Sequence, residues 1–302
     1  MILAAGLTPA WQQILSFSTL RLGEVNRAEE AVGCASGKVL NVGSAVHHLG
    51  LPSLTLCPVG GSTGHLIQAD FAQLQIPATW LDTASPTRVC TTILDRATGR
   101  TTELVENSAP LSSVELDQFA EAFAAAAQQA EIVVLSGSLP HQTPRDFYAR
   151  LMSQTSARVL LDARGPELQA ALPCRPWLIK PNREELAQTL GRPLDTPDAL
   201  IAGIRELQAA GARHVIVSDG VGALYAADPG GVQVIPTLTV RTVNPIGCGD
   251  CLAAGLAVAA LEGRPWNDVL AFGIAAAAEN ASRLLPARFP RAAVEQRLLR
   301  LT

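Results

Sequence analysis

The chain has 302 residues, of which 48% are apolar, and a formal net charge of −4. Such a chain can bury a large core, and its acidic balance does not fit a nucleic-acid binder that depends on a basic surface. No apolar run reaches the roughly 18 residues that a membrane span needs, so we expect neither nucleic acid nor membrane as a partner.

The N-terminus and the cysteines indicate the compartment. No basic region precedes the first apolar residues, so we do not expect a secretory signal. Six cysteines are spread through the chain, which is too sparse for a small disulfide scaffold and typical of a reducing environment. The sequence therefore predicts a cytoplasmic protein.

Two stretches in the first third of the chain are extended and have no helix within them, from about 11–31 and 87–105. The second predicts a hairpin that turns at Ala97-Thr-Gly99. Between these stretches, Leu54–Val59 has the pattern of a strand and His65–Leu74 that of a helix. We expect the two extended stretches to form a small antiparallel sheet, a β-sheet lid that covers a site at the strand ends.

From residue 112 onwards, short apolar runs alternate with helical patterns. Ile132–Leu135 is typical of a buried parallel strand, and the helix ahead of it, 112–130, could be capped by Ser113. Alternating strands and helices predict βαβ units and a mostly parallel central sheet flanked by helices. The further strand patterns are 159–162, 177–180 and 214–218, the last preceded by a helix at 197–210.

The segment Gly247-Cys-Gly-Asp250 runs directly into an alanine-rich apolar stretch. Small residues let the backbone approach a ligand, and the N–H groups of a helix starting near Asp250 would point at an anion. Asp250 could accept a proton from a substrate hydroxyl, and phosphoryl transfer needs both parts. Two alternatives remain open at this point: a simple turn with Asp250 as N-cap, or a redox pair formed by Cys248 and Cys251. A zinc site would need further ligands at suitable spacing, which the sequence lacks.

Four segments in order resemble the PfkB (ribokinase-like) carbohydrate kinases. They are RLGEVNRAEE followed by SGKVLNVGSAVHHLG, LSGSLPHQTPRDFYARL, LIKPNREEL and VNPIGCGDCLAAG. The resemblance is strongest to the 1-phosphofructokinase and tagatose-6-phosphate kinase branch. It implies a three-layer ribokinase-like α/β fold, with 1–302 as a single kinase domain, and an ATP-dependent enzyme that phosphorylates an alcohol group.

The resemblance also implies roles for individual residues. Asp250 matches the family base, and Gly247, Cys248 and Gly249 match its anion hole. Asn182 and Glu185 match the motif that helps to hold Mg²⁺, often through water, and hard oxygen ligands suit that ion. The residues that match nucleotide-binding positions are Ser218, Gly220, Gly222 and, on a helix flanking the adenine, Asn280.

On the sugar side, Lys38 and Asn41 lie in a segment that resembles the sugar-binding motif, and Arg88 lies where the branch carries an arginine on the lid. A lysine and an arginine suit a substrate phosphate. Gln12 stands where the branch usually has an aspartate, and an amide offers one acceptor oxygen where a carboxylate offers two. Ser36 and Val39 replace family glycines, and Val39 adds bulk near the ligand.

The sequence thus favours a kinase that transfers the γ-phosphoryl group of ATP, with Mg²⁺, to a hydroxyl of a sugar or sugar phosphate. The altered sugar side keeps two alternatives open. The chain could be a catalytically impaired sugar-phosphate or nucleotide binding protein, or a kinase of a different small hydroxylated substrate. The exposed edges of the lid also predict a homodimer formed through it.

Overall fold

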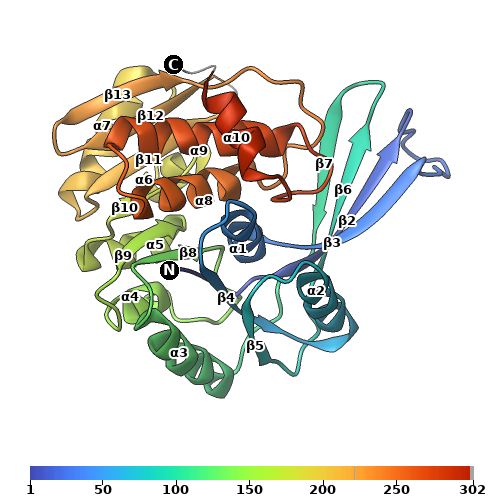
Figure 1. Cartoon of the computed structure of the whole chain (residues 1–302), viewed down its shortest axis with the longest axis horizontal. Helices are drawn as coiled ribbons and strands as arrows, with labels where there is room; N and C mark the ends of the chain where they lie inside the picture. Colours follow the sequence, from blue (N-terminus) through green and yellow to red (C-terminus); the bar gives the residue numbers. More distant parts are fainter. Residues whose placement is uncertain (221, 300–302) are drawn as a thin grey trace.

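The computed structural model describes residues 1–220 and 222–299. Its largest element is a sheet in which most neighbouring strands pair in parallel, as the sequence predicted (Figure 1). The strands are β1 (Ile2–Ala5), β4 (Ser53–Val59), β5 (Ala78–Asp82), β8 (Ile132–Ser136), β9 (Arg158–Asp162), β10 (Leu178–Ile179), β11 (His214–Asp219), β12 (Ala223–Asp228) and β13 (Gly231–Pro236).

These strands form a 9-stranded sheet in the order β13-β12-β11-β10-β9-β8-β1-β4-β5. Only β12 and β13 run antiparallel to their neighbours, at one edge. In β1 the side chains alternate between the two faces, so Ile2 and Ala4 join one core cluster while Leu3 and Ala5 join the other. The sheet is therefore covered on both faces, which gives three layers.

Helices from different parts of the chain cover the two faces. The face of Ile2 and Ala4 is covered by α1 (Lys38–His48), α2 (Gly61–Gln73), α8 (Cys248–Leu261), α9 (Trp266–Ala281) and α10 (Arg291–Leu298). The face of Leu3 and Ala5 is covered by α3 (Ser113–Ala127), α4 (Phe147–Met152), α5 (Gly165–Ala171), α6 (Arg183–Leu190) and α7 (Pro197–Ala209). In the described residues, no helix is long and apolar enough to cross a bilayer.

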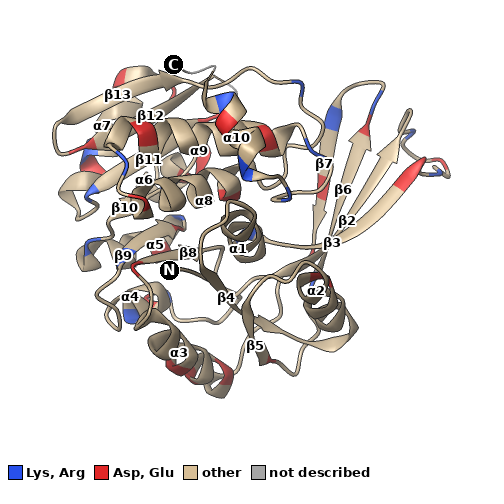
Figure 2. Cartoon of the chain, in the orientation of Figure 1, with Lys and Arg blue, Asp and Glu red and all other residues tan. Residues whose placement is uncertain are grey.

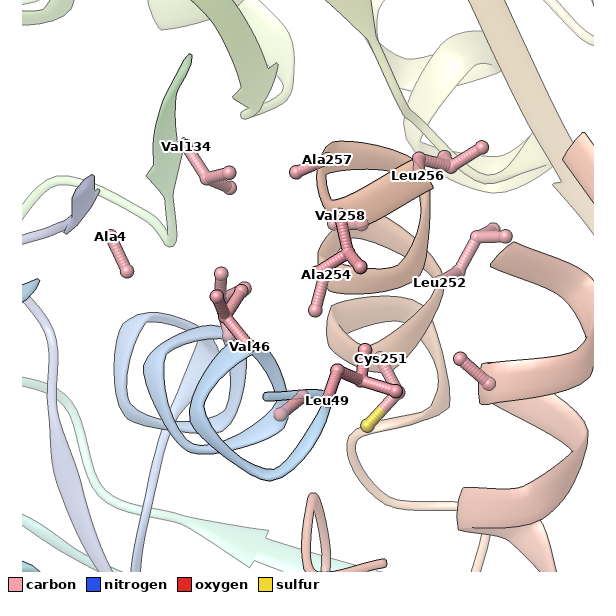
Figure 3. Close-up of a cluster of buried hydrophobic side chains, with 14 of the residues drawn as sticks. Ala4, Val46, Leu49, Val134, Cys251, Leu252, Ala254, Leu256, Ala257 and Val258 are labelled. Atoms are coloured by element: carbon pink, nitrogen blue, oxygen red, sulfur yellow. The ribbon is translucent and has the colours of Figure 1, made fainter. Parts of the chain in front are cut away.

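Helix α8 lies deep in the core because its side chains are small. Figure 3 shows Cys251 and Ala254 on the side of α8 that faces Val46 of α1 and Leu49, the residue that follows α1. On the side towards α9, a Cβ on Gly255 would lie only 2.9 Å from the Cα of Gly273. The packing of both sides fixes the position of the N-terminus of α8, where the predicted anion site lies.

A second sheet of four strands stands to one side of the three layers (Figure 1). Its order is β3-β2-β6-β7, with β2 (Ala10–Phe17), β3 (Glu30–Ser36), β6 (Val89–Asp95) and β7 (Arg100–Val105). The hairpin turning at Ala97-Thr-Gly99 is confirmed. The expectation of a wholly antiparallel sheet is wrong, because β2 and β6 pair in parallel. The first extended stretch also differs, since residues 18–29 form no strand and β3 runs on to Ser36.

One local expectation needs correction. Ser112, not Ser113, caps α3, because its side chain and that of Glu115 form a reciprocal capping box. Figure 2 shows acidic and basic residues mixed along the same elements, for example on α10 and β7.

Candidate active site

A cleft of about 1360 Å³ opens between the carboxyl ends of the parallel strands and the four-stranded sheet. Open α/β sheets commonly bind ligands at this edge. Residues from β9, β11 and the N-terminus of α8 form its floor, and β2, β6 and β7 form one wall. The cleft therefore brings together segments from both ends of the chain.

The N-terminus of α8 opens into this cleft. Gly247 is its N-cap, with a φ of 80° that favours glycine, and a Cβ there would lie 3.2 Å from Nδ2 of Asn41. Within the part of the chain that the structure describes, the N–H groups of Gly249 and Asp250 make no hydrogen bond. Two N–H groups and the positive end of the helix dipole are thus available to an anion.

Asp250 lies in the first turn of α8 and is not its cap, so the simple N-cap interpretation is wrong. It is 6% exposed, and its Oδ2 accepts a hydrogen bond from Nδ2 of Asn41 at 2.7 Å. Oδ1 of Asn41 in turn accepts from the hydroxyl of Ser36 at 3.0 Å. Asn41, which we expected to contact the sugar, is thus hydrogen-bonded to Ser36 and Asp250.

The pKa of Asp250 lies above its ordinary value, chiefly because the carboxylate is buried. The nearby carboxylate of Asp162 raises this pKa further. The hydrogen bond from Asn41 and the ammonium groups of Lys38 and Lys180 oppose that rise. A raised carboxylate pKa brings the group closer to the range in which it works as a general base.

Asp162 is the centre of a buried charge cluster. Its Oδ1 lies 3.0 Å from Nζ of Lys38, and its Oδ2 lies 3.1 Å from Nζ of Lys180. Burial alone would raise the pKa of Asp162, but the Lys180 and Lys38 ammonium groups hold it below its ordinary value. Lys38 also lies 3.4 Å from Glu185 Oε1, so this cation, expected to meet a substrate phosphate, is already paired with two carboxylates.

Sequence reasoning gave no role to Asp162 or Lys180. Each comes at the end of an apolar strand pattern, and β9 and β10 are neighbours in the sheet. Polar residues that end adjacent parallel strands meet at one edge, and this signal was present in the sequence. Lys180 also lies beside the anion site, because a Cβ on Gly249 would be 3.4 Å from its Nζ.

Asn182 and Glu185 form a capping box at the start of α6. Oδ1 of Asn182 accepts from the N–H of Glu185 at 2.8 Å, and Oε2 of Glu185 accepts from the N–H of Asn182 at 2.9 Å. Both residues line the cleft. The described residues include no group of three His, Cys, Asp or Glu side chains that could hold a metal. This donor set fits Mg²⁺ held by one or two carboxylates, water and phosphate better than a closed protein cage.

Gln12 and Arg88 line the opposite wall. Nε2 of Gln12 donates to the hydroxyl of Thr92 at 2.7 Å. The guanidinium of Arg88 donates to the carbonyls of Thr8, Pro9 and Glu106 at 3.1–3.4 Å. Three of the five N–H donors of this arginine therefore hold strand ends together, which leaves two for a ligand.

The residues expected to bind nucleotide are only partly brought together. Ser218 and Gly220 line the cleft, whereas Gly222 lies in the β11–β12 hairpin and is not part of the lining. Asn280 is fully buried, and its amide bonds to the backbone of Ile246 and Ala287 at 2.8 and 2.7 Å. This position does not fit an adenine contact, so Asn280 instead fixes the loop ahead of α8. The wall that α9 gives to the cleft consists of Ile274, Ala277, Ala278 and Ala281.

Cys248 and Cys251 both lie against Asn280, with each sulfur 3.3 Å from an atom of its amide. Burial raises the pKa of both thiols, whereas a redox-active pair has a lowered thiol pKa at the helix start. All six cysteines of the chain are free. The arrangement therefore favours an anion site over redox chemistry.

The comparisons agree with this geometry. A family model described as pfkB family carbohydrate kinase matches residues 12–288. Phosphofructokinase-2 from Escherichia coli, solved with fructose-6-phosphate, is 25% identical, with a TM-score of 0.89 and coverage of 100% of this chain and 99% of that chain. A possible 1-phosphofructokinase from Thermotoga maritima is 21% identical, with a TM-score of 0.91 and coverage of 98% and 97%. The ribokinase of Arabidopsis thaliana is 19% identical, with a TM-score of 0.75 and coverage of 98% of both chains, and shares the fold.

Proposed function

The chain belongs to the pfkB family of carbohydrate kinases, and from this premise we propose that it transfers the γ-phosphoryl group of ATP to a hydroxyl of a sugar phosphate. The observation that carries the proposal is the placing of Asp250 beside the free N–H groups at the start of α8. One group can accept a proton, and its neighbours can stabilise the charge that develops on the transferred group.

The two ends of the cleft differ in the polarity of their lining, which supports a separate place for each substrate. Beyond α8 the cleft is lined by apolar side chains of α9 and by Leu238 and Val240, which suit the flat face of a base. Towards the four-stranded sheet the lining is polar, with Thr8, Gln12 and Ser138 among its residues, which suits a polyhydroxylated acceptor. The reacting oxygen and the γ-phosphate would then meet at Asp250.

In this arrangement Asp250 removes the proton from the acceptor hydroxyl as its oxygen bonds to the γ-phosphorus, and the bond from that phosphorus to the bridging oxygen breaks, releasing ADP. The N–H groups of Gly249 and Asp250 stabilise the equatorial oxygens, and Lys180 adds a positive charge beside them. Asn41 keeps the carboxylate of Asp250 directed into the cleft. Asn182 and Glu185 would hold Mg²⁺ through water, and that ion would neutralise charge on the phosphates.

An acceptor without a phosphate remains the second candidate, and one observation favours it. Lys38 is paired with two carboxylates, and most donors of Arg88 are bonded to carbonyls. The phosphofructokinase-2 of Escherichia coli has been solved with fructose-6-phosphate, which supports a phosphosugar. A free sugar or polyol would need neither cation.

We also propose that two copies associate through the four-stranded sheet. Its edge strand β7 carries Leu104 and Val105, which are 56% and 54% exposed, and unpaired strand edges readily pair with another chain. Light scattering of the purified protein measures this association directly, and a monomer at micromolar concentration would contradict it.

We also propose a cytoplasmic location.

The function is tested by following ADP release with ATP, Mg²⁺ and a panel of acceptors. The panel contains fructose 6-phosphate, fructose 1-phosphate, tagatose 6-phosphate and the free sugars. At least one acceptor should raise ADP release above the background, and Asp250→Asn should lower kcat by about 10²–10⁴-fold. Glu262→Gln, on the distant end of α8, is the matched control. If no acceptor stimulates ADP release, or if Asp250→Asn leaves the rate unchanged, the kinase assignment is wrong.

A further inference from the structure

Glu103 is a carboxylate on the acceptor side of the cleft that the proposed mechanism does not use. It lies on β7, directly opposite Thr92 of β6 in the strand pairing, and it lines the cleft together with Gln12. The side chain of Gln12 reaches the hydroxyl of Thr92 at 2.7 Å. Glu103 and Gln12 therefore flank the same threonine on the face of the sheet that is turned to the cleft.

The carboxylate of Glu103 has no partner among the described residues, since it takes part in no hydrogen bond or ion pair there. Of the other acids that line the cleft, Asp162 pairs with Lys180, and Asp250 accepts from Asn41. Partial burial raises the pKa of Glu103, and the nearby charge of Asp250 raises it further, against the effect of Arg88. Both acids line the same cleft, so the hydroxyls of a ligand bound there can donate to the carboxylate of Glu103 in place of water.

Among the described residues of β2, β6 and β7 that line the cleft, no other carboxylate is present. Gln12 is 2% exposed, and its amide nitrogen is bonded to Thr92. An amide also presents one acceptor oxygen, whereas a carboxylate presents two. Arg88 is a donor only and cannot accept a hydrogen bond from a hydroxyl. Neighbouring hydroxyls of a sugar are two donors at short spacing, which matches the two oxygens of one carboxylate.

We propose that Glu103 selects the acceptor by accepting hydrogen bonds from two neighbouring hydroxyls, an inference that rests on the proposed kinase function. Glu103 is then a specificity-determining residue, and the bound diol lies between it and Asp250. Hydroxyls are favoured at this place, and a phosphate group is repelled by the two acids. Any phosphate on the acceptor would therefore point away from Glu103, towards Arg88.

The experiment compares the wild-type protein with Glu103→Gln and with Glu30→Gln, a carboxylate of the same sheet outside the cleft lining. KM for ATP and KM for the acceptor are measured separately, and binding of the same sugars without ATP is measured by calorimetry. The acceptor used is the best sugar of the panel above, together with its monodeoxy analogues. Because Glu103 is exposed, the substitution should not disturb folding, and circular dichroism checks this.

Glu103→Gln should weaken acceptor binding and raise KM for the acceptor by about tenfold or more. A change of this size corresponds to the loss of a hydrogen bond to a charged group. KM for ATP should stay within about twofold, because the nucleotide end is unchanged. The variant should also lose the preference for the diol over the deoxy analogue. Glu30→Gln should behave as wild type.

The outcomes separate the inference from the function on which it rests. If the wild type turns over a sugar and Glu103→Gln binds it equally well, the role of Glu103 is refuted and the kinase assignment stands. If the wild type binds a sugar but releases no ADP, the kinase assignment fails, and calorimetry with Glu103→Gln still decides the role of Glu103. If the wild type binds no sugar of the panel, both are refuted.

Discussion

Asn41 of α1 donates a hydrogen bond from its Nδ2 to Oδ2 of Asp250 at the start of α8. The two residues are 209 positions apart in the chain, and both are buried. This contact fixes the direction of the carboxylate and opposes the rise of its pKa that burial causes. It couples the geometry of the proposed base to its protonation state.

The first prediction concerns this contact. Asn41→Ala removes a donor that lowers the pKa of Asp250, so this pKa should rise further. A base is inactive when protonated, so the acidic limb of the kcat/KM profile should move to higher pH. At pH 6.5 the variant should be about tenfold slower than wild type, with a smaller deficit at pH 8.5. Ser36→Ala, which touches Asn41 and not Asp250, should leave the limb in place. An unshifted limb in Asn41→Ala would argue against Asp250 as the base.

The second prediction concerns the stability of the charge cluster. Asp162→Asn leaves Lys180, whose side chain is 5% exposed, without its buried counter-ion. The free energy of unfolding at pH 7 should fall by about 3–5 kcal/mol, as for other broken buried pairs. Asp162→Asn combined with Lys180→Met should be less destabilised than the single variant. Urea unfolding followed by circular dichroism gives both values, and a loss below about 1 kcal/mol would contradict the prediction.

The same cluster predicts how stability depends on pH. The folded-state pKa of Asp162 is held below its ordinary value. Asp162 therefore makes its full contribution to the free energy of unfolding at pH values above the ordinary Asp pKa. That contribution is lost as the pH falls through the lower pKa that Asp162 has in the folded state. The wild type should lose stability over that acidic range, and the double variant should lose less. Equal slopes in the two proteins would contradict this assignment.

A third prediction separates two roles of Asn182. Asn182→Ser keeps an N-cap oxygen and should change the free energy of unfolding by less than about 1 kcal/mol. If Asn182 also helps to hold Mg²⁺, the variant should need a higher Mg²⁺ concentration for half-maximal rate. Asn182→Ala should show the same change in Mg²⁺ requirement. It should also lower the free energy of unfolding by about 0.5–2 kcal/mol, because the N-cap oxygen is lost. An unchanged Mg²⁺ requirement in Asn182→Ser would restrict this residue to capping α6.

A fourth prediction concerns the thiol of Cys248. This residue lines the cleft, so its alkylation should block activity and bound ATP should protect it. Because its pKa is raised, alkylation should be slow at pH 7 and faster at pH 9. Cys248→Ser should stay active and become insensitive. Buried Cys251 should stay unmodified, and exposed Cys174 should react without consequence. Loss of activity in Cys248→Ser would mean that the sulfur itself takes part.

The sequence predicted those parts of the site that depend on local pattern. Small residues followed by an apolar run indicated where α8 begins, and Asp250 lies there as expected. The cluster of Asp162 and Lys180 was missed, because the pairing of β9 with β10, and not spacing along the chain, brings them together. Asn280 was assigned to the nucleotide from the resemblance of its helix to the one that flanks the adenine in the family. An alanine-rich helix has no polar stripe that shows which of its faces meets the cleft.

The same limit applies to the four-stranded sheet. Alternation of residues predicts strands and hairpins but does not say how two hairpins join. The parallel pairing of β2 with β6 places Gln12 opposite Cys90. The position of Glu103 follows from that register and from the β6–β7 pairing. Its place in the cleft could therefore not be read from the sequence.

This parallel pairing also has a consequence during synthesis. The hairpin of β2 and β3 leaves the ribosome well before β6. Until β6 emerges, Trp11 and Leu15 lack their strand-pairing partners Val89 and Ile93. Contacts between distant segments form slowly, and a waiting strand edge can pair with another nascent chain. The wall of the cleft is completed when β7 emerges, and its floor only when α8 follows. Ligand binding is therefore among the last properties that the growing chain acquires.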